Sequence, residues 1–245
     1  CRAKALRGAE VFLPFPSVGA TENTMLAACA AKGETVLHGA AREPEIIALQ
    51  DYLNLLGADV SGAGTGDIHI RSMEPETQIS FRIMPDRIVA STLACAAAAC
   101  GGDVELRGVN PAHFSTVLYF LNQSGCDIIS NKRAVRIISD GKLKAVGDIS
   151  TAPYPGFPTD AQPVLMAALL KAEGRTLITE NIFENRFRQA AELRRLGADI
   201  TVSGRQAEIW GVERLRGTTL NATDLRGGAA MIIAGMCAEG ETVVC

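Results

Sequence analysis

The sequence has no surplus of basic residues and few aromatic ones. Of its 245 residues, 24 are lysine or arginine, 27 are aspartate or glutamate, and 5% are aromatic. A protein that holds the phosphate backbone of a nucleic acid needs clustered cations, and no basic stretch interleaved with aromatic residues occurs. We therefore expect no nucleic acid among the partners of this protein.

Apolar runs long enough to span a bilayer are also missing. The longest nearly apolar stretches, residues 88–100 and 227–237, are shorter than the roughly 20 residues that a membrane-spanning helix requires. With 47% hydrophobic residues, the chain nevertheless has enough apolar side chains for a substantial core. These stretches therefore predict buried helices, and we expect no membrane span.

The sequence lacks the residue spacings that mark metal sites and reactive cysteines. Its three histidines, His38, His69 and His113, have no ligand spacing, and no two of its seven cysteines form a C-x-x-C pair. We expect neither a metal nor a cofactor. The cysteines are better explained as small, buried, unreactive side chains of a reduced, cytoplasmic protein. This interpretation applies to Cys29, Cys95, Cys100, Cys126 and Cys237.

What the sequence does contain is an internal repeat marked by glycines. Three glycines each end an apolar run and open a strand-like segment, and each is followed by an (L/S)GxD turn at a nearly constant interval. The pairs are Gly33 with Gly57, Gly102 with Gly125, and Gly174 with Gly197. A fourth copy opens at Gly240, and the sequence stops inside it. Because repeats bury their apolar faces against neighbours, we expect the chain to be a fragment of a longer protein.

Each repeat reads as a helix, a strand, a second helix, a turn and two strands. The first helices are apolar nearly all round and should be buried, whereas the second helices carry one polar face and should cover a sheet. The first helices are expected at 21–32, 88–100, 162–172 and 227–238, and the second at 43–56, 112–123 and 185–196. This pattern predicts an α/β fold, an inside-out α/β barrel whose buried helices are covered by outer β-sheets.

Proline and glycine residues mark boundaries and turns within the repeats. Pro85 follows the strand-like segment 79–83 and marks a candidate domain crossing, so that residues 1–84 and 85–245 form separate parts. The glycine-rich segment 62–66 resembles a nucleotide-binding loop, but no helix opens after it. We interpret this segment as a hairpin turn.

Polar residues precede each predicted buried helix, at 17–23, 85–87, 158–160 and 223–226. A helix N-terminus offers free N–H groups and a partial positive charge, which favour phosphate or carboxylate groups. The alternative is that Ser17, Asp86, Asp160 and Asp224 are only N-caps, worth about 1 kcal/mol each. Arg87 and Arg226, beside two of these positions, favour an oxyanion site because guanidinium groups bind oxyanions in pairs of hydrogen bonds.

A further cluster, Phe-Glu-Asn-Arg-Phe at 183–187, allows two interpretations. Its charges are either a solvated pair beside core phenylalanines, or Arg186 is carried into a cleft by the flanking aromatic rings. The sequence alone leaves both open.

Five segments resemble the bacterial UDP-N-acetylglucosamine 1-carboxyvinyltransferases. They are Ser-Val-Gly-Ala-Thr-Glu-Asn at 17–23, Ala-Ala-Arg-Glu-Pro-Glu-Ile at 40–46, Tyr-Pro-Gly-Phe-Pro-Thr-Asp at 154–160, the cluster at 183–187, and Ala-Thr-Asp-Leu-Arg at 222–226. The resemblance covers essentially the whole chain, in order. It implies transfer of the enolpyruvyl group of phosphoenolpyruvate to the 3-hydroxyl of UDP-N-acetylglucosamine with release of phosphate, the first committed step of peptidoglycan precursor synthesis.

The resemblance also implies a domain assignment and residue roles. Residues 1–84 would be the last repeat of the domain that carries the UDP-sugar site and the reactive loop, and 85–245 most of a second, truncated domain. Ser17, Val18 and Gly19 would meet the UDP diphosphate, and Ile182 would line the sugar nucleotide site. Asp160 would bind and deprotonate the attacking hydroxyl. Arg186, Asp224 and Arg226 would face the enolpyruvyl end.

The sequence departs from the family in several places. The family's N-terminal lysine-asparagine pair and its reactive loop precede residue 1, so we expect this fragment alone to be inactive. Val89 stands where many relatives have glutamate, and Pro163 interrupts the usual pattern after Asp160. Two alternatives stay open, namely 3-phosphoshikimate 1-carboxyvinyltransferase and a noncatalytic α/β binding module. The segments at 17–23 and 157–160 favour the sugar nucleotide enzyme.

Overall fold

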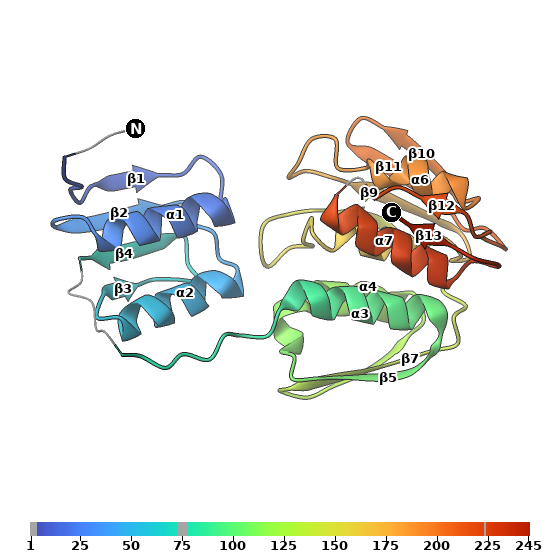
Figure 1. Ribbon diagram of the computed structural model, residues 1–245, viewed down its shortest axis with the longest axis horizontal. Coiled ribbons are helices and arrows are strands. Elements are labelled where there is room, and N and C mark those ends of the chain that lie inside the picture. The colour runs from blue at the N-terminus through green and yellow to red at the C-terminus, as the bar shows by residue number, and fades with distance from the viewer. Residues whose placement is uncertain (1–3, 73–77, 223) are drawn as a thin grey trace. The chain divides into compact units, whose positions relative to one another are not determined.

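The computed structural model describes residues 4–72, 78–222 and 224–245, and the chain divides into two compact units (Figure 1). Unit 1 comprises Cys1–Met84 together with Pro153–Pro155, and unit 2 comprises Pro85–Ala152 and Gly156–Cys245. Both units mix helices and strands, so the α/β fold class is confirmed. Thr223, in one of the polar segments singled out above, lies outside the described residues.

Unit 1 is a four-stranded sheet covered on one face by two helices. The strand order is β1-β2-β4-β3, with β1 parallel to β2 and the other pairs antiparallel. Residues on β4 alternate between exposed and buried, because one face of the sheet packs on the helices and the other meets solvent. The elements are β1 (Glu10–Phe12), α1 (Val18–Cys29), β2 (Glu34–His38), α2 (Pro44–Leu55), β3 (Asp59–Ser61) and β4 (Asp67–Arg71). The turn expected at 62–66 joins β3 to β4.

Unit 2 surrounds its inner helices with three sheets. One is antiparallel, in the order β5-β7-β6; the second has the order β10-β11-β9-β8; the third pairs β12 with β13. The strands are β5 (Gly102–Arg107), β6 (Asp127–Ser130), β7 (Ala134–Ser139), β8 (Gly147–Ser150), β9 (Arg175–Thr179), β10 (Asp199–Ser203), β11 (Gln206–Trp210), β12 (Thr219–Leu220) and β13 (Val243–Val244). The helices are α3 (Arg87–Cys100), η1 (Pro111–Phe114), α4 (Ser115–Gln123), α5 (Gln162–Ala168), α6 (Gln189–Arg195) and α7 (Leu225–Met236).

The repeat predicted from the glycines is present in the backbone. In each complete copy, the strand after the inner helix pairs with the last strand of the copy, which pairs in turn with the middle one. The strand that precedes an inner helix pairs in parallel with the strand that follows that helix: β1 pairs with β2, β8 with β9 and β12 with β13. Gly33 and Gly174, at matching positions, have φ of 95° and 107°, a region that residues with a Cβ rarely adopt. These glycines are needed to turn the chain from inner helix to strand.

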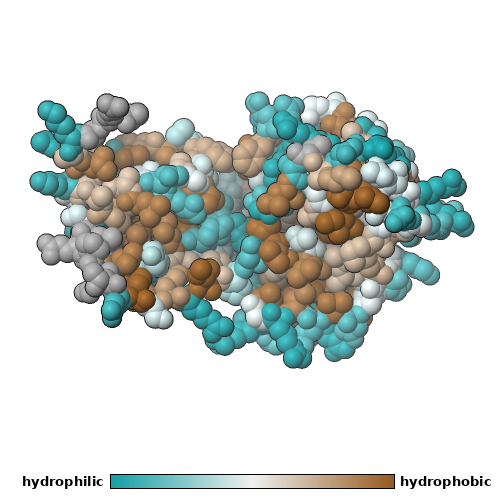
Figure 2. All heavy atoms as spheres, in the orientation of Figure 1, coloured by the Kyte–Doolittle hydropathy of each residue, from teal (hydrophilic) through white to brown (hydrophobic). Residues whose placement is uncertain are grey.

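The inner helices are less uniformly covered than the sequence predicts. Every residue of α5 is buried, and α5 packs against both α3 and α7. In contrast, Val89 and Leu93 on α3 are 54% and 50% exposed, and Ile232 and Met236 on α7 are 54% and 61% exposed. Apolar residues accordingly gather on the surface of unit 2 over α3 and α7 (Figure 2). Leu26 on α1 is likewise 52% exposed. The expectation of burial on every side is therefore wrong for α1, α3 and α7 among the described residues.

Two local predictions also differ from the structure. The helix expected at 185–196 begins only at Gln189, because Asn185 has φ of 53° and interrupts helical geometry. The strand-like segment 79–83 forms no strand and instead belongs to the connection from unit 1 to unit 2. Within the described part of the chain, we find no helix with both the length and the apolarity to cross a bilayer.

Candidate active site

Asp160 is the centre of a cluster of charged side chains in unit 2. Nη2 of Arg186 and Nε of Arg226 each donate to its Oδ1 at 3.1 Å. The side chains of Asp160, Arg186 and Arg226 are 35%, 21% and 30% exposed, so the cluster is half-buried and still partly in contact with solvent. One carboxylate between two guanidinium groups leaves a net positive charge, which suits an anionic ligand.

The first turn of α7 positions Arg226. Asp224 is the N-cap of this helix, and its Oδ1 accepts hydrogen bonds from the backbone N–H groups of Arg226 at 3.0 Å and Gly227 at 2.9 Å. An aspartate at this position stabilises the helix end and fixes the direction of the next side chain. The structure thus places Asp224 as a support for Arg226, while Arg226 itself reaches Asp160.

Asp160 itself is not a cap. The N-cap of α5 is Ala161, and no side chain caps this helix. The N-cap interpretation is therefore wrong for Asp160, although it is right for Ser17, Asp86 and Asp224, whose side chains accept from the first-turn N–H groups. Freed from capping, the Asp160 carboxylate makes its contacts with the two arginines instead.

A tight turn between β9 and α6 positions Arg186. The turn places the guanidinium of Arg186 over the ring of Phe183, 5.4 Å from its centroid, while Phe187 is buried in the core. Nε of Arg186 is buried and has no hydrogen-bond partner among the described residues. Of the two interpretations of the 183–187 cluster, the solvated pair does not hold for Arg186, which contacts Asp160 and the ring of Phe183 instead. An unpaired buried donor is costly, so this atom is a natural contact for a ligand oxygen.

Glu180, which lies in none of the sequence motifs, holds this region together. Its side chain is buried, and Oε1 accepts from the Thr151 hydroxyl at 2.9 Å and from the backbone N–H groups of Ile182 at 2.9 Å and Phe183 at 3.1 Å. Oε2 accepts from the Thr159 hydroxyl at 2.9 Å. One carboxylate therefore links the residue after β8, the residue before Asp160 and the start of the Arg186 turn. Only the tertiary contacts reveal this role, because a lone glutamate after a strand has no distinctive sequence pattern.

Ile182 is held by Glu180 through its backbone. Its N–H donates to Glu180, which fixes the chain three residues before Asn185. The neighbouring Asn181 donates from its backbone N–H to the Thr151 hydroxyl at 2.8 Å and from its side chain to the Thr151 carbonyl at 3.1 Å. These bonds make the segment that carries Ile182 part of the same rigid network as Asp160.

In unit 1, Ser17, Val18 and Gly19 form the start of α1. The Ser17 side chain accepts from the N–H of Ala20 at 3.3 Å, a long capping bond. A pocket of about 240 Å³ adjoins this end of the helix; it is lined by Pro16, Gly39, Ala40, Arg42, Gly66, Pro153 and Tyr154, all within unit 1. The pocket brings a cation, Arg42, close to a helix N-terminus, a combination that favours a phosphate group.

Acidic side chains also gather in unit 1. Burial raises the pKa of Glu22 above its usual range, and the negative charges of Glu45 and Glu43 raise it further. A carboxyl group whose pKa is higher in the folded chain binds more protons when folded. Stability therefore falls as pH rises from about 4.5, the unfolded value, through the raised folded value.

We accordingly expect Glu22→Gln to stabilise unit 1 at pH 7 and to have no effect below about pH 4, where the carboxyl is protonated in both states. Amide hydrogen exchange of α1, measured at both pH values, checks this. Asp51→Asn, an exposed carboxylate on α2, is the control and should change exchange at neither pH. Equal or faster exchange in Glu22→Gln at pH 7 would contradict the expectation.

No group of three or more His, Cys, Asp or Glu side chains within the described residues is arranged to hold a metal ion. The chemistry available at the Asp160 cluster is instead that of one carboxylate and two guanidinium groups. A carboxylate can accept a proton, and the guanidinium groups can stabilise anionic oxygens.

The chain is similar to known proteins over its whole length. Residues 1–245 match the protein family described as EPSP synthase (3-phosphoshikimate 1-carboxyvinyltransferase). The chain is 49% identical over 243 residues to UDP-N-acetylglucosamine 1-carboxyvinyltransferase 1 of Carboxydothermus hydrogenoformans, and 46% identical over 241 residues to the UDP-N-acetylglucosamine 1-carboxyvinyltransferase of Trichlorobacter lovleyi. These matches cover 99% and 98% of this chain but 58% and 57% of those proteins. The chain thus spans little more than half the length of these relatives.

Solved structures agree with the fold. The enolpyruvyl transferase NikO from Streptomyces tendae superimposes with a TM-score of 0.85 at 25% identity, covering 99% of this chain and 60% of that one. An EPSP synthase from Acinetobacter baumannii superimposes with a TM-score of 0.71 at 22% identity, covering 98% of this chain and 58% of that one, which supports the fold alone.

Proposed function

Since the chain belongs to the EPSP synthase (3-phosphoshikimate 1-carboxyvinyltransferase) family, we propose that it supplies catalytic residues for an enolpyruvyl transfer. In this reaction the enolpyruvyl group of phosphoenolpyruvate passes to the 3-hydroxyl of UDP-N-acetylglucosamine, and phosphate is released. The sugar nucleotide is favoured as the acceptor because relatives at 46–49% identity carry that activity in their names. The observation that carries the proposal is the Asp160 carboxylate held between Arg186 and Arg226.

In this proposal Asp160 binds the acceptor hydroxyl and takes its proton. Both arginines contact Oδ1, which directs the second oxygen, Oδ2, to the substrate. The oxygen freed of its proton adds to C2 of phosphoenolpyruvate while the neighbouring CH2 carbon takes up a proton, which gives a tetrahedral addition intermediate. Loss of a proton from the new methyl group and departure of phosphate then re-form the double bond. A carboxylate within hydrogen-bond reach of the hydroxyl contributes typically 10²–10⁴-fold to such a step.

Arg186 and Arg226 stabilise the anionic groups of phosphoenolpyruvate and of the addition intermediate. The unpaired Nε of Arg186 supports this role, because a phosphate or carboxylate oxygen would give that buried donor a partner. Asp224 acts by holding the helix turn that carries Arg226, and Ile182 lines the sugar nucleotide site.

For unit 1, we assign Ser17, Val18 and Gly19 to the diphosphate of the sugar nucleotide. The helix N-terminus, the long and therefore weak Ser17 capping bond and the nearby Arg42 pocket support this assignment. We also infer that the reaction takes place in the cytoplasm and serves peptidoglycan synthesis, and hence cell shape and division. The assignment of residues 1–84 and 85–245 to two domains of a longer enzyme belongs to the same proposal.

Two substitutions of Ser17 test the diphosphate assignment. Ser17→Ala removes a hydroxyl donor and should weaken UDP-N-acetylglucosamine binding by about tenfold, the value of one hydrogen bond to a charged group. Ser17→Asp keeps a good N-cap but adds a negative charge, so it should leave α1 stable and weaken binding further. Isothermal titration calorimetry and amide exchange of α1 measure the two effects. Unchanged affinity in Ser17→Asp contradicts the assignment.

The acceptor is tested by phosphate release from phosphoenolpyruvate with the complete gene product. We expect turnover with UDP-N-acetylglucosamine and none with shikimate 3-phosphate. Turnover with shikimate 3-phosphate and none with UDP-N-acetylglucosamine would favour the 3-phosphoshikimate 1-carboxyvinyltransferase reaction, which the family description names. Binding of the sugar nucleotide without turnover of either acceptor would instead indicate a noncatalytic binding module.

A further inference from the structure

Two cysteines that are predicted from the sequence to be buried and unreactive lie side by side in unit 2. Cys100 is the last residue of α3 and is exposed, and Cys237 is the C-cap of α7 and is half-buried. Their Sγ atoms are 3.8 Å apart, although the two residues are 137 positions apart in the sequence. The expectation of burial is therefore wrong for this pair, because helix ends lie at the surface even when the helices are apolar.

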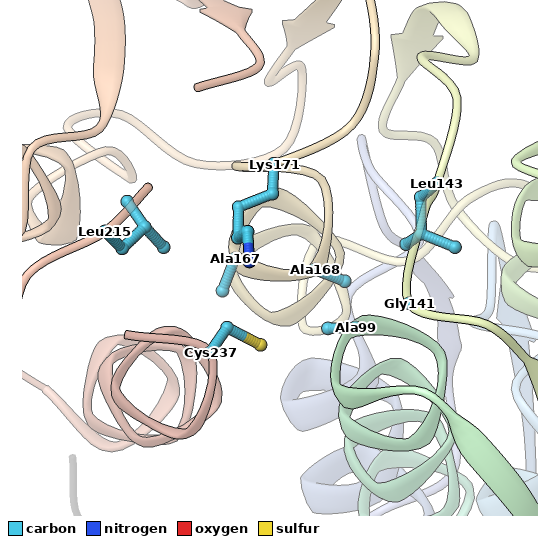
Figure 3. A pocket seen from close by; sticks show the side chains of 8 residues that line it. All are labelled: Ala99, Gly141, Leu143, Ala167, Ala168, Lys171, Leu215 and Cys237. Atoms are coloured by element: carbon cyan, nitrogen blue, oxygen red, sulfur yellow. The ribbon is translucent and has the colours of Figure 1, made fainter. Parts of the chain in front are cut away.

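The C-terminal ends of three helices, α3, α5 and α7, lie around the cysteine pair. Figure 3 shows a pocket at this point, with Ala99 of α3, Cys237 of α7 and Lys171, which follows α5, among the residues that line it. The Sγ of Cys237 points toward the end of α3, and the Lys171 side chain extends along α5 toward Cys237. The space among these side chains is too small for a water molecule, so a reagent in solution reaches the pair at the exposed Cys100.

The two thiols differ in reactivity. Burial and, to a smaller extent, the neighbouring Cys100 together raise the pKa of Cys237 to about 12, against the opposing effect of the positive charge of Lys171. The C-terminal end of a helix also disfavours a negative charge. Cys237 is therefore protonated at neutral pH, and the exposed Cys100 is the thiol that a reagent in solution meets first.

We propose that Cys100 and Cys237 form a redox-responsive dithiol that low-molecular-weight disulfides convert into an intramolecular disulfide. Cys100 loses its proton to solvent and attacks one sulfur of the reagent, which breaks the reagent's S–S bond and releases one thiol. Cys237 then loses its proton and attacks Cys100 in the mixed disulfide, releasing the second thiol. The protein loses two protons and two electrons, and the reagent gains both and becomes two thiols.

The geometry allows the second step. A disulfide needs an S–S distance of about 2.05 Å, so the sulfur atoms must approach by nearly 2 Å, which side-chain rotation and small shifts at two helix ends can supply. The bond would close a loop of more than a hundred residues within the chain. Cross-links over long loops restrict the unfolded chain most, so oxidation should stabilise unit 2.

The test uses the 245-residue chain with oxidised glutathione as the probe. After incubation and acid quenching, peptide mapping without reduction should identify a Cys100–Cys237 disulfide. Thermal unfolding followed by the fluorescence of Trp210, the single tryptophan, should shift upward by at least about 5 °C and return on addition of dithiothreitol. Cys245→Ser, which removes another exposed thiol, should behave like the parent chain.

Cys237→Ser separates the two steps. In this variant Cys100 should keep one bound glutathione, and neither the cross-link nor the stabilisation should form. If the parent chain likewise keeps glutathione on Cys100 and forms no Cys100–Cys237 disulfide under any ratio of oxidised to reduced glutathione, the proposal is overturned. A Cys237→Ser variant that gains the same stability on oxidation overturns it as well.

Discussion

Replacing Asp160 with asparagine should lower the turnover of the complete gene product by at least about a hundredfold. Asparagine keeps an oxygen that can accept from Arg186 and Arg226, so the cluster should still fold. It cannot take a proton from the acceptor hydroxyl, and loss of a general base commonly costs 10²–10⁴-fold in rate. The measurement is steady-state phosphate release with saturating phosphoenolpyruvate and UDP-N-acetylglucosamine.

The matched control for this substitution is Asp199→Asn, in the same repeat. Asp199 is an exposed residue of the LGAD turn at the start of β10, on an outer sheet, and its replacement should leave turnover unchanged. Binding of the sugar nucleotide to Asp160→Asn, measured by calorimetry, separates a loss of chemistry from a loss of affinity. Near-normal turnover in Asp160→Asn would remove this residue from the mechanism.

Replacing Glu180 with leucine should destabilise unit 2 by about 3 kcal/mol or more. The substitution leaves the backbone N–H groups of Ile182 and Phe183 without their acceptor, and a buried unsatisfied donor costs about 1–3 kcal/mol. The hydroxyls of Thr151 and Thr159 lose their partner as well. For a domain of this size, the unfolding temperature should fall by roughly 6–12 °C, which Trp210 fluorescence can follow.

Two further variants test whether the hydrogen bonds to the Glu180 carboxylate are responsible for this stability. Glu180→Gln keeps one acceptor oxygen and the size of the side chain, so it should retain most of the stability. Glu184→Leu replaces a glutamate in the same turn whose side chain is 84% exposed and lies 3.7 Å from Arg205; an ion pair of this kind contributes little. If Glu180→Leu unfolds at the same temperature as Glu184→Leu, the carboxylate does not hold the loops together.

Much of the fold could be predicted because the repeat is local. A glycine such as Gly174 is needed wherever a helix must turn into a strand with positive φ, and apolar periodicity marks the helices on either side. Element boundaries were less predictable. The helix expected from residue 185 starts four residues later, because Asn185 adopts a left-handed conformation that its sequence neighbours do not dictate.

The candidate site was only partly predictable. Sequence motifs identified four of its residues, Asp160, Arg186, Asp224 and Arg226. The motifs did not indicate the separate contacts of these residues, because Asp160 pairs with arginines that are 26 and 66 positions away in the sequence. Nothing in the sequence distinguished Asp160, which is not a cap, from Asp224, which is one.

The sequence by itself determined the α/β repeat, the polar segments before the inner helices and the family to which the chain belongs, because these depend on spacings along the chain. The tertiary structure alone decided which polar groups meet: Glu180 with four donors from three segments, one carboxylate between two arginines, and two thiols at the ends of α3 and α7. The physical reason is that burial and pairing depend on distances across the fold. Helix and strand periodicities specify which face of an element is buried, but not which side chain of another repeat it meets.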